Sequence, residues 1–433
     1  MKKYYAIWLI IALLVLSLTV SCTKIHEQKH DKTEIKFWHA LGGPLGDALT
    51  QLVDEFNREQ DSIFVRVISM GNYQALSQKL MASLQANNQP EIAQVFESWT
   101  ANFIEGNVLV PIDEFIEQDS SFIRQMDDFY PVFIDSNTIN GKIWSFPFNK
   151  SLRVLFYNKD AFYREGLDHE TGPKTWEDFK LYAKVLSKDH NGDGDYDIFG
   201  STFAISAWQF ENLLLQAGGQ IMNEGYTKAY FNSDAGVEAI KFMSDLLNID
   251  KTVYLSTGYD GQNDFLSGKI AMLESSSVTY AYLQESGIPF NLGVSAIPEY
   301  KNNKSIVSGT NVAIFKMKDK KKEKSAWEFI KWFTDTKQTA RFSEMTYYMP
   351  VRKSAMQENN IKTMLNENKG LADVYAMLES AEFEPQIPEW FELRKYIEEQ
   401  VIEKVFRGLL QPKNALDLAA KKLNTEIEKN KKE

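Results

Sequence analysis

The sequence predicts an α/β protein with a mostly parallel sheet, and two observations carry this prediction. The chain has 433 residues, of which 44% are apolar and 25% charged, so it is long enough for two or three globular domains. From residue 34 onward, apolar runs alternate with helical patterns: a strand at 34–39, a helix at 46–59, a strand at 63–69, a helix at 73–87 and a strand at 92–96. This βαβαβ order implies a sheet with helices on both faces.

Polar residues gather where these strands end. Ligands of such sheets bind beyond the carboxyl ends of the strands, and that edge carries His39, Gly71, Asn72, Tyr73 and Glu97. A catalytic base at His39 would need a partner, and no motif supplies one. We therefore expect His39 either at the rim of a cleft or behind the ligand contacts, in a hydrogen-bonding role.

The pattern changes at Pro147, which stands between an extended segment and the apolar run Leu152–Tyr157. The chain is expected to leave one lobe there and to enter another. Further patterns predict helices at 175–187, 234–247 (with Ser233 as N-cap) and 325–335, and strands at 270–273 and 291–296.

The N-terminus has the pattern of a secretory signal peptide over residues 1–21. Two lysines precede an apolar run at 4–20, and Ser21 and Cys22 follow it. At 17 residues this run is also at the short limit for a permanent membrane helix, which is the alternative. Cys22 is the only cysteine, so it forms no internal disulfide. It resembles the acylated cysteine of lipoproteins, with Thr19 where that pattern has Leu, and residues 22–33 would then be a flexible tether.

Charge and motifs exclude several classes of function. The net charge of −11 without a basic block argues against sequence-general nucleic-acid binding. The chain lacks a G-x-S-x-G motif, a phosphate-binding loop and histidines at metal-ligand spacing, so no enzyme is expected. The alternative from another class is a surface glycosidase that uses Glu97 and a second carboxylate from 382–398.

The segment DHNGDGDYD offers oxygen ligands at alternate positions around Gly194 and resembles the first part of a calcium loop. Gly200 stands where a bidentate Glu would complete such a site. A solvated turn of Asp and Asn residues is the alternative, and either would be structural. The possible calcium ligands are Asp189, Asn191, Asp193, Asp195 and Asp197.

Nine stretches, in order over about residues 34–425, carry a family resemblance. They are FWHALGGPLGDALTQLVDEFN, GNYQALSQKL, PEIAQVFESWT, PFNKSLRVLFYNKDAF, PKTWEDF, SGKIAMLESSS, SGTNVAIF, YYMPVRKSA and QPKNALDLA. They resemble the extracellular solute-binding proteins (family 1) of carbohydrate-type ABC importers. FWHALGGPLG, GNY and QVFESWT are most similar to the glycerol-3-phosphate-binding branch of that family.

The resemblance implies a periplasmic-binding-protein-like fold of two α/β lobes, joined by a multi-segment hinge, with the ligand cleft between them. The first lobe would comprise 34–146 plus about 305–346, and the second about 147–304 plus about 347–433. Such receptors close on a small-molecule ligand and dock onto the transmembrane subunits of an ABC permease. The protein would be lipid-anchored outside the cytoplasm, on the periplasmic side or the cell surface.

The ligand implied is glycerol-3-phosphate or a glycerophosphodiester, and a neutral oligosaccharide is the alternative. The match assigns the phosphate-binding cation to either Arg394 or Lys395. A sugar is favoured if both of these residues lie outside the cleft. Lys150 departs from the family pattern, which has a small residue there; it would strengthen anion binding or point to solvent.

Each implied ligand contact has a role and a simpler alternative. Tyr73 and Glu97 would hold glycerol hydroxyls, and Arg394 would bind phosphate. Ser151 lies in the crossing segment, and Ser276 and Ser277 would precede a helix whose free amides suit an anion. Trp208 would form an apolar wall, Gly309 would allow close backbone approach, and Tyr348 would donate a phenol. Without the resemblance, the aromatic residues would be core, the glycine a turn residue and the arginine one end of a surface ion pair.

Overall fold

The computed structural model describes residues 32–431. The expected signal peptide, the possible membrane helix, Cys22 and nearly all of the tether lie outside the described residues. Among the residues described, none of the helices is long and apolar enough to cross a membrane.

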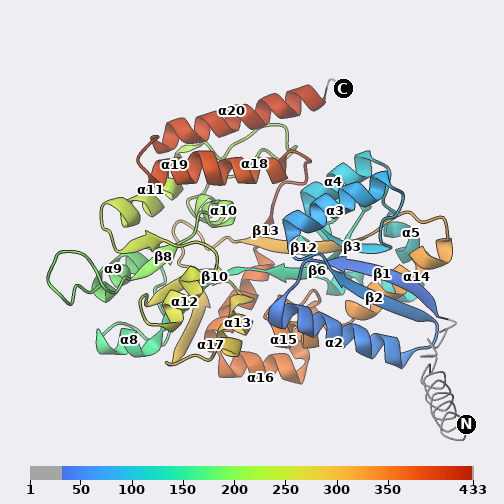
Figure 1. Cartoon of the computed structure of the whole chain (residues 1–433), viewed down its shortest axis with the longest axis horizontal. Coiled ribbons are helices and arrows are strands. Elements are labelled where there is room, and N and C mark those ends of the chain that lie inside the picture. The colour runs from blue at the N-terminus through green and yellow to red at the C-terminus, as the bar shows by residue number, and fades with distance from the viewer. Residues whose placement is uncertain (1–31, 432–433) are drawn as a thin grey trace, which may run out of the picture.

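A six-stranded sheet organises one half of the molecule, drawn to the right in Figure 1. Its strands are β1 (Thr33–His39), β2 (Ile63–Ser69), β3 (Ile92–Val95), β6 (Phe146–Ser151), β12 (Ile306–Ile314) and β13 (Glu382–Phe383). β1 pairs in parallel with β2 and β3, whereas β12 runs antiparallel to both β3 and β6. The predicted βαβαβ start is confirmed, with α2 (Gly43–Glu59) and α3 (Tyr73–Gln85) between the strands.

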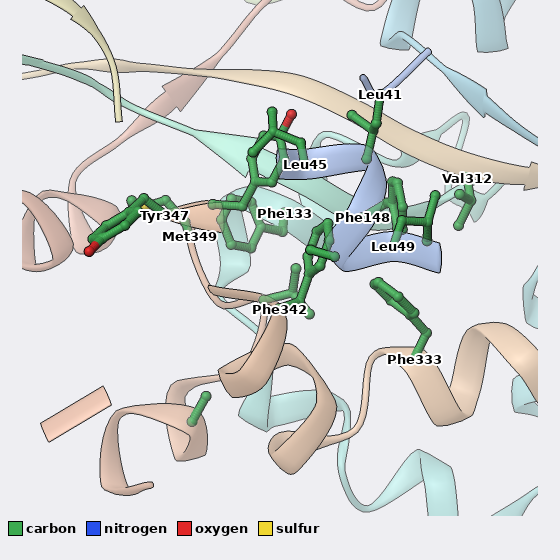
Figure 2. Packing of buried hydrophobic residues seen from close by; sticks show 14 of the residues in the cluster. Leu41, Leu45, Leu49, Phe133, Phe148, Val312, Phe333, Phe342, Tyr347 and Met349 are labelled. Atoms are coloured by element: carbon green, nitrogen blue, oxygen red, sulfur yellow. The ribbon is translucent and has the colours of Figure 1, made fainter. Parts of the chain in front are cut away.

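The helix α2 shows how the local sequence builds this half. It begins at Gly43, three residues before the predicted start, because Pro44 favours the first turn of a helix. The ring of proline fixes φ at a helical value, and an N–H at this position would have no acceptor within the helix, so its absence costs nothing. Its Leu45 and Leu49 lie on one face and pack with Phe148 of β6 and Phe342 of the helix α15 (Thr336–Thr346) (Figure 2).

A three-stranded antiparallel sheet organises the other half, with the order β10 (Met272–Ser276), β7 (Arg153–Asn158) and β11 (Leu292–Ala296). Leu152 alone separates β6 from β7, so the chain passes from one sheet to the other within one residue. Pro147 lies inside β6, opposite Asn311, where a register irregularity accommodates a residue without an N–H. The lobe limits expected from the sequence stay a prediction.

Helices cover both halves. Beside the three-stranded sheet lie α8 (Lys159–Arg164), α9 (Trp176–Leu186), α10 (Ala207–Gln216), α11 (Asp234–Asn248), α12 (Asp260–Leu266), α13 (Thr279–Ser286) and the strand pair β8 (Ser201–Phe203) and β9 (Val253–Leu255). Beside the six-stranded sheet lie α4 (Glu97–Glu105), α14 (Lys320–Phe333) and α15 (Thr336–Thr346).

The C-terminal elements link the two halves. α16 (Asn359–Glu367) packs on α15, and α17 (Lys369–Ala376) packs on β11. The last elements, red in Figure 1, are α18 (Trp390–Tyr396), the π-helical turn η4 (Ile397–Ile402), α19 (Glu403–Phe406) and α20 (Pro412–Asn430).

The short elements are α5 (Asp113–Ile116), α6 (Ser120–Ile123), η1 (Met126–Asp128), α7 (Pro131–Asp135), β4 (Thr138–Ile139), β5 (Lys142–Ile143), η2 (Lys353–Gln357) and η3 (Met377–Glu379).

The elements predicted after Pro147 are found with shifted limits. α14 begins at Lys320, five residues before the expected start, because Asp319 accepts a hydrogen bond from the backbone of Lys321 and caps a lysine-rich first turn. Ser233 precedes α11 as expected, but its side chain makes no capping hydrogen bond.

Candidate ligand-binding cleft

Tyr73 is held by a hydrogen-bond network from the six-stranded sheet. Its phenol oxygen accepts a hydrogen bond from Asn149 Nδ2 at 3.2 Å. The amide oxygen of Asn149 accepts from Gln94 Nε2 at 2.9 Å and from the hydroxyl of Thr310. Tyr348 joins this group: burial raises its pKa well above the usual value, and the neighbouring Tyr73 adds to the shift. Two of the expected ligand contacts, Tyr73 and Tyr348, are therefore brought together.

Glu97 and Lys150 form a buried ion pair beside this network. Glu97 is the first residue of α4, where the helix dipole favours a negative charge. Its Oε1 accepts from Lys150 Nζ at 2.7 Å and from Asn311 Nδ2 at 3.0 Å. The side chains of Lys150 and Glu97 are 1% and 8% exposed. The expectation that Lys150 could point to solvent is therefore wrong.

Gly309 is explained by strand packing. Its φ is 109°, and a Cβ there would stand 2.0 Å from the carbonyl oxygen of Asn149. Glycine is thus required by the close approach of β6, a different reason from the turn or the ligand contact considered from the sequence. Ser151, the last residue of β6, is buried opposite Ser308.

Arg153 covers the tryptophan that was expected to be an apolar wall. Its guanidinium lies 5.3 Å from the ring centroid of Trp208 and is bonded through Nε to Glu274 at 2.6 Å. Gln209 donates to the other oxygen of Glu274 at 3.0 Å. A cation on its ring face means that Trp208 does not present that face as a bare apolar surface.

The two serines before α13 are already engaged in the fold. Ser276 ends β10, where it pairs with Arg153 of β7. Ser277 donates its amide N–H to Leu152 and its hydroxyl to the carbonyl of Tyr347 at 2.8 Å. The backbone N–H of Ser277 is thus used within the fold, and anion binding by the free amides of the helix that follows stays a prediction.

Arg394 faces two buried carboxylates. Its Nη1 lies 3.2 Å from Glu384 Oε1, and its Nε lies 3.6 Å from Glu211 Oε1. Burial alone would lower the pKa of Arg394, but the two carboxylates outweigh it and raise that pKa. Burial raises the pKa of Glu211 well above its usual value, with the charge of Glu384 adding to it and Arg394 opposing it. Neither carboxylate oxygen of Glu211 has a hydrogen-bond partner among the described residues.

Lys395 lies outside this cluster. Its side chain is 62% exposed and its ammonium is 4.0 Å from Glu399. The π-helical turn η4 follows within two residues, and such a turn holds one residue more than an α-helical turn.

A groove of about 460 Å³ runs between α3 and the C-terminal helices. Its lining includes Gln74 and Gln78 of α3 and, across from them, Arg394 and Phe391 of α18. Burial raises the pKa of Glu384. The charge of Arg394 opposes this rise, and the charge of Glu97 adds to it, so Glu97 and Glu384 are within electrostatic reach of each other. Arg394 therefore faces the gap between the halves.

Sequence reasoning missed several residues of this cleft. Asn149 and Asn311 are fully buried polar residues on strands, and they could have been noticed because FNKS and SGTN place polar side chains within otherwise apolar runs. Tyr226 has a φ of 49°, and burial raises its pKa, with the charges of Glu382 and Glu97 contributing. No local pattern marked it, because its electrostatic interaction with Glu97 depends on the tertiary structure.

His39 is buried within the six-stranded half. It is 5% exposed, and burial lowers its pKa to about 4, with a hydrogen bond to the backbone of Leu41 opposing the shift. It lies 6.1 Å from the ring of Phe37. His39 is therefore not exposed at a cleft rim, whereas a hydrogen-bonding role behind the ligand contacts stays a prediction, and the imidazole is neutral near pH 7.

The loop at 189–197 has the hydrogen bonds of a turn. Asp189 accepts from the backbone of Gly192 and Gly194, and these bonds lower its pKa. Asp197 accepts from the backbone of His190 at 2.7 Å. Across residues 32–431 no three His, Cys, Asp or Glu side chains are grouped to hold a metal ion. These hydrogen bonds are those of a turn, and the calcium site stays a prediction.

Comparison with known proteins places the chain in a family. The model of the bacterial extracellular solute-binding proteins matches residues 51–368. The chain belongs to this family. The resemblance found in the sequence is thus confirmed, and this protein is a solute-binding receptor of an ABC importer, periplasmic or extracellular, and not an enzyme. The alternative of a surface glycosidase is removed.

Individual relatives agree with this assignment. The chain is 28% identical over 421 residues, 90% of each chain, to the sn-glycerol-3-phosphate-binding periplasmic protein UgpB of Pectobacterium atrosepticum. Among solved structures it is similar to UgpB of Mycobacterium tuberculosis in complex with glycerophosphocholine, with a TM-score of 0.80, 22% identity and coverage of 92% of this chain and 99% of that one. An ABC substrate-binding protein of Listeria monocytogenes in complex with cycloalternan gives a TM-score of 0.79 at 22% identity, with the same coverage. The periplasmic-binding-protein-like fold is confirmed.

Proposed function

We propose that this receptor captures a glycerophosphodiester by closing its two lobes, in preference to glycerol-3-phosphate, and delivers it to a membrane permease. The support for a glycerol phosphate ligand is the similarity to UgpB proteins and the match of Tyr73, Glu97 and Arg394 to that branch.

The pairing of the cleft cations carries the preference for a diester. Lys150 is paired with Glu97, Arg153 with Glu274, and Arg394 with Glu384 and Glu211. A phosphate monoester carries close to two negative charges at neutral pH, because its second pKa is near 6, whereas a diester carries one. With each cation already faced by a carboxylate, a dianion lacks compensating charge, so the monoanion is favoured.

Titration calorimetry of the purified protein with three ligands tests this proposal. We expect micromolar or tighter binding of glycerophosphocholine and glycerophosphoglycerol, at least tenfold weaker binding of glycerol-3-phosphate, and no heat with maltose. Stronger binding of glycerol-3-phosphate than of either diester would overturn the preference. Binding of maltose alone would overturn the ligand class.

A neutral oligosaccharide is the second candidate. The observation in its favour is that carboxylates already balance the charges of Arg153 and Arg394, so neither guanidinium needs an anion to neutralise it. The maltose titration decides between the two.

The envelope location includes a lipid anchor in our proposal. The N-terminal pattern that ends at Cys22 supports acylation of that thiol, and residues 22–33 would then tether the receptor to a membrane. Mass spectrometry of the N-terminal peptide from the purified protein would detect the added acyl chains, and an unmodified Cys22 would contradict this part.

A further inference from the structure

The Lys150 ammonium has hydrogen-bond donors to spare. An ammonium has three N–H groups, and one of them bonds Glu97 Oε1 at 2.7 Å. Among the described residues no second acceptor is found for Lys150. Because its side chain is 1% exposed, unmatched donors there are costly unless a ligand or water accepts from them.

Glu97 has the complementary surplus. Lys150 and Asn311 both donate to its Oε1, and no hydrogen bond to Oε2 is found within residues 32–431. Asn311 is itself fixed, since its amide oxygen accepts from Asn137 at 2.9 Å. The pair thus offers donors and an acceptor side by side, on rigid supports and at no net charge.

We propose that Lys150 determines specificity: its ammonium binds the phosphodiester oxygens while Glu97 Oε2 accepts the neighbouring glycerol hydroxyl. This inference rests on the proposed glycerophosphodiester function. In glycerol phosphate esters a hydroxyl donor stands close to an anionic acceptor, which is the arrangement that the pair complements. Arg394 is less available for this contact, because Glu384 and Glu211 already face its guanidinium.

The test compares the ratio of two affinities, glycerol-3-phosphate against glycerophosphoglycerol, in the wild type and in variants. Glu97→Gln leaves Lys150 unneutralised, so we expect the ratio to shift at least fivefold toward the dianionic glycerol-3-phosphate. Lys150→Met removes the cation; we expect at least a tenfold loss of diester affinity and a ratio shifted the other way. Lys150→Arg keeps the charge and should recover part of the diester affinity.

Two further variants separate binding from folding. Lys150→Met leaves a buried Glu97 without its cation, so the double variant Lys150→Met/Glu97→Gln provides a neutral pair if the single variant is unstable. Lys188→Met breaks an ion pair of similar length, 2.6 Å to Glu165, on a more exposed part of the structure, and should leave both affinities unchanged.

The outcomes distinguish the two proposals. If the wild type binds glycerophosphoglycerol but the ratio is unchanged in Glu97→Gln and in the Lys150 variants, all with native melting temperatures, the role of Lys150 is refuted and the receptor function stands. If the wild type binds no glycerophosphodiester, both proposals fall. A ratio that shifts in opposite directions in the two charge variants supports the inference, since a purely structural lysine would lower both affinities together.

Discussion

The two sides of the cleft balance their charges differently. On the six-stranded sheet, Glu97 shares its charge with one lysine and one amide donor. Opposite it, Glu211 and Glu384 share a single arginine, and burial raises the pKa of both carboxyl groups. The first side is a neutral and prearranged pair, whereas the second holds a surplus of buried carboxylate that protonation relieves. Stability should therefore respond to mutation and pH differently on the two sides.

The largest effect is expected from Arg394→Met. Removing one partner of a buried charge cluster costs about 3 kcal/mol, because Glu211 and Glu384 lose their cation. Both carboxyls can take up protons, so the loss should be smaller at pH 5 than at pH 8. Urea denaturation at the two pH values measures it. Lys395→Met, one residue along and exposed, should change stability by less than about 0.5 kcal/mol.

The contribution of these two carboxyl groups to the stability of the wild type should also decrease as the pH rises. A carboxyl whose folded pKa is raised contributes stability below that pKa, and the contribution falls as the pH rises from the unfolded value of 4.5 through the folded pKa. An equal cost of Arg394→Met at pH 5 and pH 8 would contradict the contrast between the two sides.

His39, in the six-stranded half, should respond to pH in the opposite direction. Burial lowers its pKa from 6.5 to about 4, so the unfolded chain binds a proton in this window that the folded protein does not. The contribution of neutral His39 to the free energy of unfolding is about 3 kcal/mol. It is fully present above pH 6.5 and is lost as the pH falls toward 4. The difference in unfolding free energy between the wild type and His39→Asn, followed from pH 7 to pH 4, isolates this contribution.

His190→Asn is the matched control, because His190 lies in the exposed 189–197 loop. We expect its unfolding free energy to follow that of the wild type at every pH. A wild type and His39→Asn with parallel pH profiles would show that His39 is not the group responsible.

The sequence predicted those parts of the fold that depend on local pattern. The start β1–α2–β2–α3–β3 follows from periodicity, and β2 has the predicted limits of Ile63–Ser69. The errors lie where a contact distant in sequence sets the outcome. Pro147 is expected at the end of an extended segment, but it lies inside β6, where β12 pairs with it next to a register irregularity; the lobe crossing expected there stays a prediction.

The site divides in the same way. Tyr73, Glu97 and Arg394 could be named because they match family motifs. The pairing of Lys150 with Glu97 joins residues 53 apart in sequence, and the placing of Arg153 over Trp208 requires two elements to pack. A sequence shows which charges exist, but which of them neutralise one another depends on the tertiary structure.

The smallest effect is expected where the two sides meet, at Phe391. Its ring stands 5.3 Å from that of Trp99, edge to face, and 6.3 Å from that of Phe96, both on the six-stranded side. Its chain neighbour Trp390 instead packs in the core of the other half. Because α18 thus contacts both halves, we expect the Phe391 ring to stabilise the closed arrangement (Figure 1).

Phe391→Ala should remove an edge-to-face contact that contributes about 1 kcal/mol. If the contact stabilises the closed state alone, the apparent ligand affinity should fall about fivefold, because ligand binding then has to supply the lost closure energy. The unfolding transition should then move little. Calorimetry gives the affinity, and small-angle scattering of the ligand-free protein should show a larger radius of gyration than in the wild type. Leu409→Ala, at an exposed position after α19, should change neither quantity. An unchanged affinity in Phe391→Ala would mean that the charges on the two sides, and not this aromatic contact, hold the cleft closed.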